Sequence, residues 1–177
     1  MKTADKKPSS LLFCFAHRKW DLVLHEPGHP LARPAEGHEV IYLEEPVHEP
    51  VPRPTLKTAP GGPHISIVTP VLPEVMAPDS AIGFQRSLVS MLIAAKSHDE
   101  LILWYFTPKA WAFTSHVACD VCVYDRVGDE TGCGNPPKEF SDWEEKLLVR
   151  ADVVLRNGHE DGVPCSRATD MARLFAS

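Results

Sequence analysis

Short apolar runs recur along the chain, and polar or turn-forming residues bound each of them. Runs of this length that are rich in β-branched or aromatic side chains predict buried strands. The segments that fit this pattern are 10–16, 39–43, 65–69, 101–106, 121–124 and 153–155.

Segments with helical periodicity lie between or after these runs. The clearest is 80–97, for which Asp79 after Pro78 is the expected N-cap. Its apolar positions recur on one helix face: Ile82, Leu88, Val89, Leu92 and Ala95. Shorter helices are expected over 109–117, 139–149 and 166–175.

Strands that alternate with helices predict an α/β fold, a single Rossmann-like domain with a mainly parallel sheet of about six strands and helices on both faces. We expect residues 1–10 to be a disordered leader and residues 11–177 to form the domain. Residues 44–64 hold so many prolines and glycines that we expect a Pro-rich loop without regular structure.

Ligands of parallel sheets bind beyond the carboxyl ends of the strands. The rim of any site is therefore expected at 17–20, 44–46, 105–108 and 125–130.

The charge balance bears on partners and location. The net charge is −6 and the pI is about 5.8, which argues against a nucleic-acid partner, because such proteins carry a basic face. No apolar run approaches the roughly 20 residues that span a bilayer, so we expect a soluble, cytoplasmic protein.

Five cysteines, an odd number, do not suggest a disulfide framework. Cys119 and Cys122 form a C-x-x-C, which is typical of a redox pair or half of a zinc site. No second pair follows at a finger-like spacing, and the pair falls within or just before a strand rather than at a helix N-terminus. We therefore favour buried thiols without a chemical role, and we expect neither a metal nor a cofactor.

Several segments, taken in order and spacing, resemble the N-terminal domain of a bacterial glycosyltransferase family. They are CFAHRKWDLV, VIYLEEPV, TPVLP, ILWYFTP and VYD, then a glutamate-bearing helix ending LLVRADVVL and followed by GH. The resemblance covers residues 11–160. Members of the family have the two-domain GT-B architecture and retaining chemistry, and the same domain occurs fused to a UDP-galactopyranose mutase module.

The resemblance implies that this chain is one half of a GT-B fold, the half that holds the acceptor. The nucleotide-sugar donor would be bound only by a second domain. The implied acceptor is a glycan or a lipid-linked molecule of cell-envelope polysaccharide synthesis.

The resemblance places His17, Arg18 and Trp20 on the loop after the first strand, facing the cleft. An indole offers a flat face to a sugar ring, while histidine and arginine bind hydroxyls or phosphate. The alternative for Trp20 is that it only attaches the loop to the core.

Glu45, Tyr105 and Asp125 complete the implied acceptor site, and no catalytic residue is identified. Glu44 and Glu45 are adjacent on an extended segment and so point to opposite sides, one binding hydroxyls while the other is solvated. Tyr105 either reaches the cleft or packs under a helix. Asp125 either orients an acceptor hydroxyl or caps a turn.

The chain also departs from the family pattern. Where the family has a helix beginning near Q-R-P-Q-H-L, this chain has HEPGHPLARPAEG, with Glu26 in place of the arginine. Pro30 and Pro34 would each cost about 3 kcal/mol inside a helix, so a helix over 27–34 is expected to be shortened, kinked or absent. The family's acidic stretch Y-D-C-M-D-E reads YDRVGDE here.

Three hypotheses remain open. The first is the acceptor-side half of a glycosyltransferase, inactive alone because the donor-binding domain is absent. The second is a non-catalytic Rossmann-like binding module, or the relic of a truncated gene. The third and least favoured is a free-standing C-x-x-C oxidoreductase. An uncovered domain surface predicts an apolar patch near the C-terminal helix, self-association and peripheral contact with a membrane.

Overall fold

The computed structural model describes residues 10–23, 38–126, 137–156 and 159–160. Its strands are β1 Ser10–Phe15, β2 Glu39–Leu43, β3 Val47–Glu49, β4 Thr55–Gly62, β5 Ile65–Pro73, β6 Glu100–Tyr105, β7 Val121–Arg126, β8 Val153–Arg156 and β9 His159–Glu160. Its helices are α1 Trp20–Val23, α2 Pro78–Ala94, α3 Trp111–Thr114 and α4 Lys138–Arg150, with the 3₁₀ turn η2 Pro108–Ala110 before α3. The helix expected over 166–175, the segment 27–34 and residues 1–9 of the expected leader lie outside the described residues, while Ser10, the last residue of that leader, begins β1.

The strand order is that of a Rossmann-like sheet. The described strands form one nine-stranded sheet in the order β3-β5-β2-β1-β6-β7-β8-β9, with β4 paired to β5. The six strands predicted from the sequence are β1, β2, β5, β6, β7 and β8, and each is parallel to its neighbours among them. Their order across the sheet is β5-β2-β1-β6-β7-β8. Numbered one to six along the chain, this is the order 3-2-1-4-5-6 of doubly wound folds. The predicted α/β class is confirmed, with nine strands in place of about six.

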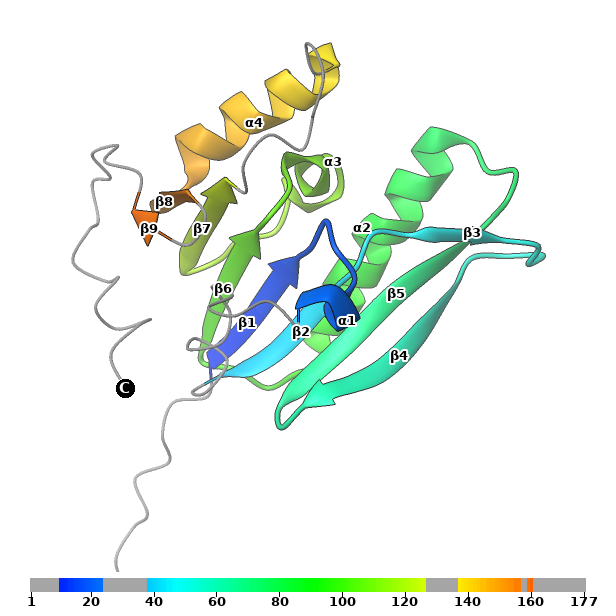
Figure 1. The fold of residues 1–177 in the computed structure, drawn as a ribbon, viewed down its shortest axis with the longest axis horizontal. Coiled ribbons are helices and arrows are strands. Elements are labelled where there is room, and N and C mark those ends of the chain that lie inside the picture. Colours follow the sequence, from blue (N-terminus) through cyan, green and yellow to red (C-terminus); the bar gives the residue numbers. More distant parts are fainter. Residues whose placement is uncertain (1–9, 24–37, 127–136, 157–158, 161–177) are drawn as a thin grey trace, which may run out of the picture.

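Helices cover both faces of the sheet, and the long ones share one face. Helices α2, α3 and α4 lie over one face and α1 lies over the other (Figure 1). Leu88 of α2, Phe113 of α3 and Leu147 of α4 pack in one hydrophobic cluster with alternate residues of the central strands, including Phe13. The other strand residues, such as Leu12, form a second cluster with Trp20 of α1. None of the helices in the described parts of the chain is long and apolar enough to span a bilayer.

The prediction of a loop without regular structure over 44–64 was wrong. β3 pairs in parallel with the end of β5, from Val47 opposite Val71, and β4 pairs antiparallel along most of β5. Val71 has partners in both β3 and β4, and Ile67 has partners in both β2 and β4. β2 and β3 therefore lie on the same side of β5, as one strand line interrupted at residues 44–46.

Pro60 and Pro70 fit this arrangement because each lies beside an irregularity of the strand pairing. Pro60 is in β4, for which β5 is the only partner among the described strands, at a register shift between Pro60 and Gly62. Pro70 lies between Val68, the last β5 residue paired with β2, and Val71, the first paired with β3. Proline is tolerated on edge strands, at bulges and at such interruptions. Local composition alone, by contrast, predicts a loop wherever prolines are frequent.

Helix α2 starts earlier than the sequence predicts. Its first residue is Pro78, so Asp79 lies in the first turn, and Ala77 occupies the N-cap position without a side-chain hydrogen bond. Proline is favourable at this first helical position because its missing N–H has no partner there in any case. The Asp79 carboxylate still stabilises the positive end of the helix dipole.

The β4–β5 hairpin is closed by a tight turn and by Trp20. The turn residues are Pro63 and His64, and His64 has a left-handed backbone with φ of 63°. Beside this turn, the Trp20 indole Nε1 donates to the Gly61 carbonyl oxygen at 3.2 Å. A Cβ on Gly61 would lie 2.8 Å from Ile65 Cγ2 and 3.1 Å from the indole, so only glycine allows this close approach.

Gly61→Ala is expected to lower the free energy of unfolding by about 1–3 kcal/mol, because the new methyl group forces Ile65 and the Trp20 indole to shift. The measurement is chemical denaturation, with the indole N–H signal of Trp20 followed by NMR. Gly83→Ala is the matched control. Gly83 is exposed in α2 with open space around it, so alanine should raise stability by up to about 1 kcal/mol. Equal stability of Gly61→Ala and the wild type would contradict the close contact.

Candidate functional site

A pocket of about 360 Å³ opens at the carboxyl ends of β1, β2 and β6. Phe15 and Ala16 from the end of β1, the residues after β2 and those after β6 line it. β1 and β6 are the first and fourth strands of the doubly wound order, so the pocket lies where the strand order reverses. Open parallel sheets bind ligands at this position, because the loops of neighbouring strands diverge there to opposite faces.

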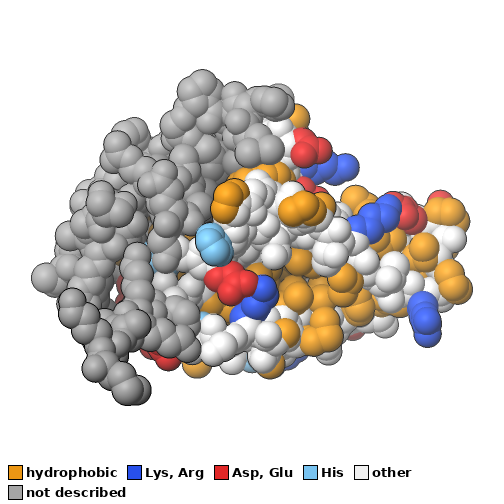
Figure 2. Space-filling view, turned by 90° about the horizontal axis from the view of Figure 1, so that it is seen from below, with side chains coloured by type: hydrophobic (Ala, Val, Ile, Leu, Met, Phe, Trp, Pro, Cys, Tyr) orange, Lys and Arg blue, Asp and Glu red, His pale blue; other side chains and the backbone are white. Residues whose placement is uncertain are grey.

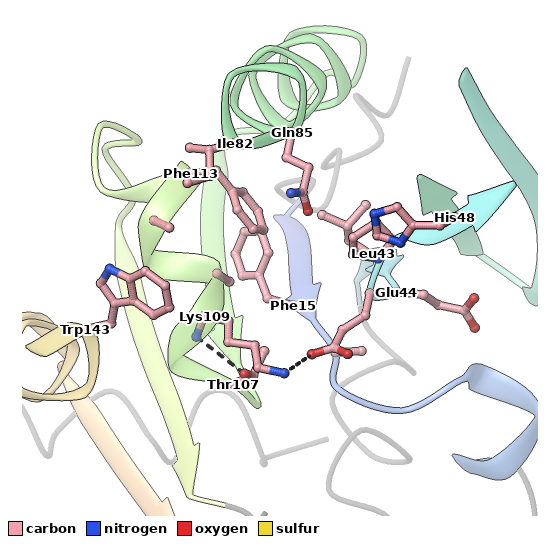
Figure 3. Close-up of a pocket in the computed structure, with 15 residues that line it drawn as sticks. Phe15, Leu43, Glu44, His48, Ile82, Gln85, Thr107, Lys109, Phe113 and Trp143 are labelled. Carbon is pink, nitrogen blue, oxygen red and sulfur yellow. Dashed lines mark hydrogen bonds and ion pairs between the residues drawn. The ribbon is translucent and has the colours of Figure 1, made fainter. Parts of the chain in front are cut away.

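The inner wall of the pocket is aromatic and apolar. Phe15 lies against Phe113, with ring centroids 6.2 Å apart in an edge-to-face arrangement. Trp143 of α4 lies at one end of the pocket and His48 at the other, and Ile82 and Gln85 of α2 lie between them (Figure 3). The Gln85 side chain is buried, and its Nε2 donates to the Ala81 carbonyl oxygen at 3.3 Å. Such a wall offers flat apolar faces with one amide to fix orientation.

The rim of the pocket carries charge. Lys109 Nζ lies 2.9 Å from Glu45 Oε1, and both side chains are about half exposed, 53% and 43%. The pair is drawn as a dashed line in Figure 3. Thr107 Oγ1 accepts from the Lys109 backbone N–H at 3.4 Å and thereby begins the η2 turn. The exposed His48 side chain of β3 lines the side beyond Glu45. Groups at this rim can donate to and accept from hydroxyls or an anionic group.

Glu44 holds the scaffold together. Its Oε1 accepts from the Trp20 backbone N–H at 2.8 Å, and its Oε2 accepts from Thr69 Oγ1 at 2.7 Å. One carboxylate therefore joins the start of α1, the end of β2 and β5. Both glutamates line the pocket, and Glu45 is the exposed member of the pair. That one of them binds hydroxyls stays a prediction.

The structure does not place the tryptophan loop around the pocket. Trp20 is only 6% exposed and packs edge-on against Tyr42, with ring centroids 4.9 Å apart. Its contacts match the alternative in which it attaches the loop to the core. The His17 ring lies 6.4 Å from that of Phe106, and the Arg18 carbonyl oxygen accepts from the Tyr42 hydroxyl at 3.0 Å. None of the three is among the residues that line the pocket.

Tyr105 and Asp125 are also buried away from the pocket. Tyr105 is fully buried, stacks on Phe15 and donates to Thr114 Oγ1 at 3.0 Å, so it packs under α3. Burial raises the pKa of its hydroxyl well above the usual range. Asp125 is fully buried in β7 and by strand alternation lies on the α1 side of the sheet, opposite the face that lines the pocket. Of the six predicted acceptor residues, Glu45 alone lines the pocket.

Sequence reasoning missed Lys109, Trp143, His48 and Gln85. Lys109 directly follows a segment expected at the rim, so a polar residue after the strand could have been included. His48 lay in the segment that was wrongly expected to be a loop. Trp143 and Gln85 are on helices, and no local signal tells which helical residue reaches over the end of a strand.

Besides the Lys109–Glu45 pair, three further ion pairs lie on the described surface. Lys57 contacts Glu49, Lys96 contacts Glu39, and Arg126 Nε lies 3.2 Å from Glu144 Oε1. On the face seen in Figure 2, basic and acidic side chains likewise lie beside one another. Within the described residues, no three His, Cys, Asp or Glu side chains are grouped so as to hold a metal ion.

Comparisons with known proteins give limited similarity. No protein-family model matches the chain, and no curated protein matches it. A solved structure described as trehalose-6-phosphate from E. coli bound with UDP-2-fluoro glucose is similar with 12% identity and a TM-score of 0.46 over 81% of this chain. An α,α-trehalose-phosphate synthase (UDP-forming) from Burkholderia xenovorans, in complex with glucose-6-phosphate, is similar with 9% identity and a TM-score of 0.44 over 82% of this chain.

A third solved structure, the corresponding synthase from Burkholderia vietnamiensis, is similar with 9% identity and a TM-score of 0.43 over 82% of this chain. The chain covers 39% of the length of each of these three structures. The fold assignment rests on the strand order of the sheet and not on these similarities.

Glu44→Gln is expected to lower the free energy of unfolding by about 1–3 kcal/mol. The amide removes the charge and turns one of the two accepting oxygens into a donor that faces the Trp20 N–H or the Thr69 hydroxyl. Glu45→Gln is the matched control, because its exposed ion pair should change stability by less than about 1 kcal/mol. Chemical denaturation compares the two, and equal effects would contradict the scaffold role of Glu44.

Proposed function

We propose that this chain is the acceptor-side half of a glycosyltransferase that moves a sugar from a nucleotide-sugar donor to a glycan or lipid-linked acceptor. The observation that carries the proposal is the pocket at the reversal of strand order, with aromatic walls and the Glu45–Lys109 pair at its rim. The family resemblance of the strand-end motifs supports the same role.

The chemistry of the pocket fits a sugar. A pyranose ring has apolar C–H faces, which aromatic rings such as Phe113 and Trp143 can cover, and hydroxyls around its edge. Glu45 accepts hydrogen bonds from hydroxyls, and Lys109 and Gln85 donate to hydroxyl or phosphate oxygens. Because Lys109 and Glu45 already pair with each other, a ligand that bridges them replaces one exposed ion pair with two charge-assisted hydrogen bonds.

Sugar transfer also needs the donor, which in enzymes of this architecture is bound by a second domain. Holding donor and acceptor together supplies much of the rate acceleration, so a pocket for the acceptor alone gives binding without turnover. We therefore separate acceptor binding, which this chain should perform, from transfer, which needs a donor-binding domain.

The binding test uses a panel of neutral mono- and disaccharides, sugar phosphates and lipid-linked glycans. Each is titrated into the ¹⁵N-labelled chain, and the indole N–H signals of its four tryptophans are followed by NMR. We expect the signal of Trp143 to shift while those of the buried Trp20 and Trp104 stay unchanged. If no sugar in the panel shifts any pocket signal, the proposal is overturned.

Lys109→Met is expected to weaken binding of the sugar found in that titration by roughly tenfold or more, the loss of one charge-assisted hydrogen bond. Lys57→Met is the matched control, since Lys57 is an exposed lysine that pairs with Glu49 and does not line the pocket. Equal affinities of the two variants would place the ligand elsewhere.

Transfer is then assayed after co-expression with a candidate donor-binding domain. Product formation from a nucleotide sugar supports the enzyme. Sugar binding without turnover in a folded complex favours the non-catalytic binding module.

A further inference from the structure

Cys119 and Cys122 lie together at the start of β7, on the face of the sheet that α3 and α4 cover. Cys119 is half-buried just before the strand, and Cys122 is buried within it. The backbone between them is fixed on both sides. The Leu101 backbone N–H donates to Asp120 Oδ2 at 2.8 Å, and the Asp120 N–H donates to the Leu101 carbonyl oxygen at 2.9 Å. The Cys122 backbone N–H donates to Asp152 Oδ2 at 2.9 Å, and the Asp152 N–H donates to the Cys122 carbonyl oxygen at 2.8 Å. The two thiols contact each other through a side-chain hydrogen bond.

Arg150, the last residue of α4, brings a positive charge to this pair. Its Nη2 donates to Cys119 Sγ at 3.3 Å and also to the Val117 carbonyl oxygen. The guanidinium carbon lies 5.5 Å from the centre of the Trp111 ring. The guanidinium is thus held by two further contacts while it faces the sulfur. This cation comes from 31 residues away in the sequence, so the C-x-x-C motif alone gives no indication of it.

The surroundings favour a thiolate at Cys119. The hydrogen bond from Cys122 and the charge of Arg150 lower the pKa of Cys119 to about 7, against the opposing effects of burial and of the Asp152 carboxylate. The hydrogen bond to Cys119, followed by burial, raises the pKa of Cys122 far above the usual range. Cys14 offers a contrast within the same chain, because complete burial raises the pKa of its thiol.

We propose that Cys119 and Cys122 are a thiol pair that hydroperoxides oxidise reversibly to a disulfide, with Cys119 as the attacking sulfur and Cys122 as the resolving sulfur. The inference rests on the C-x-x-C geometry and on the Arg150–Cys119 contact, and it is independent of the sugar-binding proposal. A low-pKa thiolate that is accessible and next to a second cysteine is the usual setting of such a pair.

The first step consumes one peroxide. The Cys119 thiolate attacks one oxygen of hydrogen peroxide, an S–O bond forms and the O–O bond breaks. The leaving hydroxide takes up a proton and becomes water. Cys119 is oxidised by two electrons to the sulfenic acid, and the peroxide is reduced.

The second step closes the disulfide. Oxidation removes the Cys119 thiolate, which is the largest cause of the raised pKa of Cys122. The Cys122 thiol then loses its proton and attacks the Cys119 sulfur. The S–S bond forms, the S–O bond breaks, and the departing hydroxide combines with that proton as water. A dithiol reductant reverses the result by exchange.

The test uses the full chain with Cys133→Ser and Cys165→Ser, so that Cys14, Cys119 and Cys122 are the remaining cysteines. After hydrogen peroxide at pH 7, mass spectrometry should show the loss of two hydrogens and a bond between Cys119 and Cys122, reversed by dithiothreitol. With Cys122→Ser added, dimedone should label Cys119 as the trapped sulfenic acid. A failure to form the disulfide, or dimedone labelling of Cys14 to the same extent, would overturn the proposal.

Arg150→Met is expected to slow oxidation at pH 7 roughly tenfold, because loss of the cation raises the pKa of Cys119. Arg53→Met, at an exposed arginine between β3 and β4, is the matched control and should leave the rate unchanged. A second readout does not depend on any change at Arg150. The rate at which iodoacetamide alkylates Cys119 should rise with pH through a midpoint near 7. A midpoint at the ordinary thiol value of about 8.5 would contradict the proposal.

Discussion

The structure depends on β1 being buried on both faces while it pairs in parallel with two strands at once. Leu11 through Phe15 are all buried, and each has a partner in β2 on one side and in β6 on the other. A parallel strand cannot be joined to its neighbour by a tight turn, so each connection must cross a face of the sheet. The residues after β1 lead into α1 on one face of the sheet, whereas those after β6 lead into α3 on the other. The pocket lies between these two diverging segments, and Phe15 at the end of β1 lines it.

At the same edge of the sheet, two neighbouring carboxylates have different roles, one in the scaffold and one at the pocket rim. The strand line of β2 and β3 breaks at residues 44–46, where two adjacent glutamates both line the pocket. The Glu44 carboxylate joins α1 and β5, while the exposed Glu45 carboxylate pairs with Lys109. An inward charge with two hydrogen bonds stabilises the frame, whereas an exposed one adds little to stability and is available to a ligand.

Helix α4 carries residues that reach both the pocket and the thiol pair. Leu147 is fully buried in the cluster beneath the helix and fixes its position over the sheet. Trp143 then reaches the pocket, and Arg150 reaches Cys119 about two turns further on. Both contacts follow from where the helix lies, because neither side chain is near its partner in the sequence.

The sequence by itself determined the order of the strands and helices, because burial on both faces leaves continuous apolar runs that are visible locally. Of the four strand ends that it predicted as a rim, 44–46 and 105–108 include residues that line the pocket, Glu45 among them. It did not identify β3 and β4, since proline is excluded from a strand only where a ladder hydrogen bond is needed, and that depends on the partner. Only the tertiary structure decided that Trp20, Tyr105 and Asp125 are buried. It also decided that Trp143 lines the pocket and that Arg150 contacts Cys119. Side-chain direction depends on packing between distant elements, which no local pattern encodes.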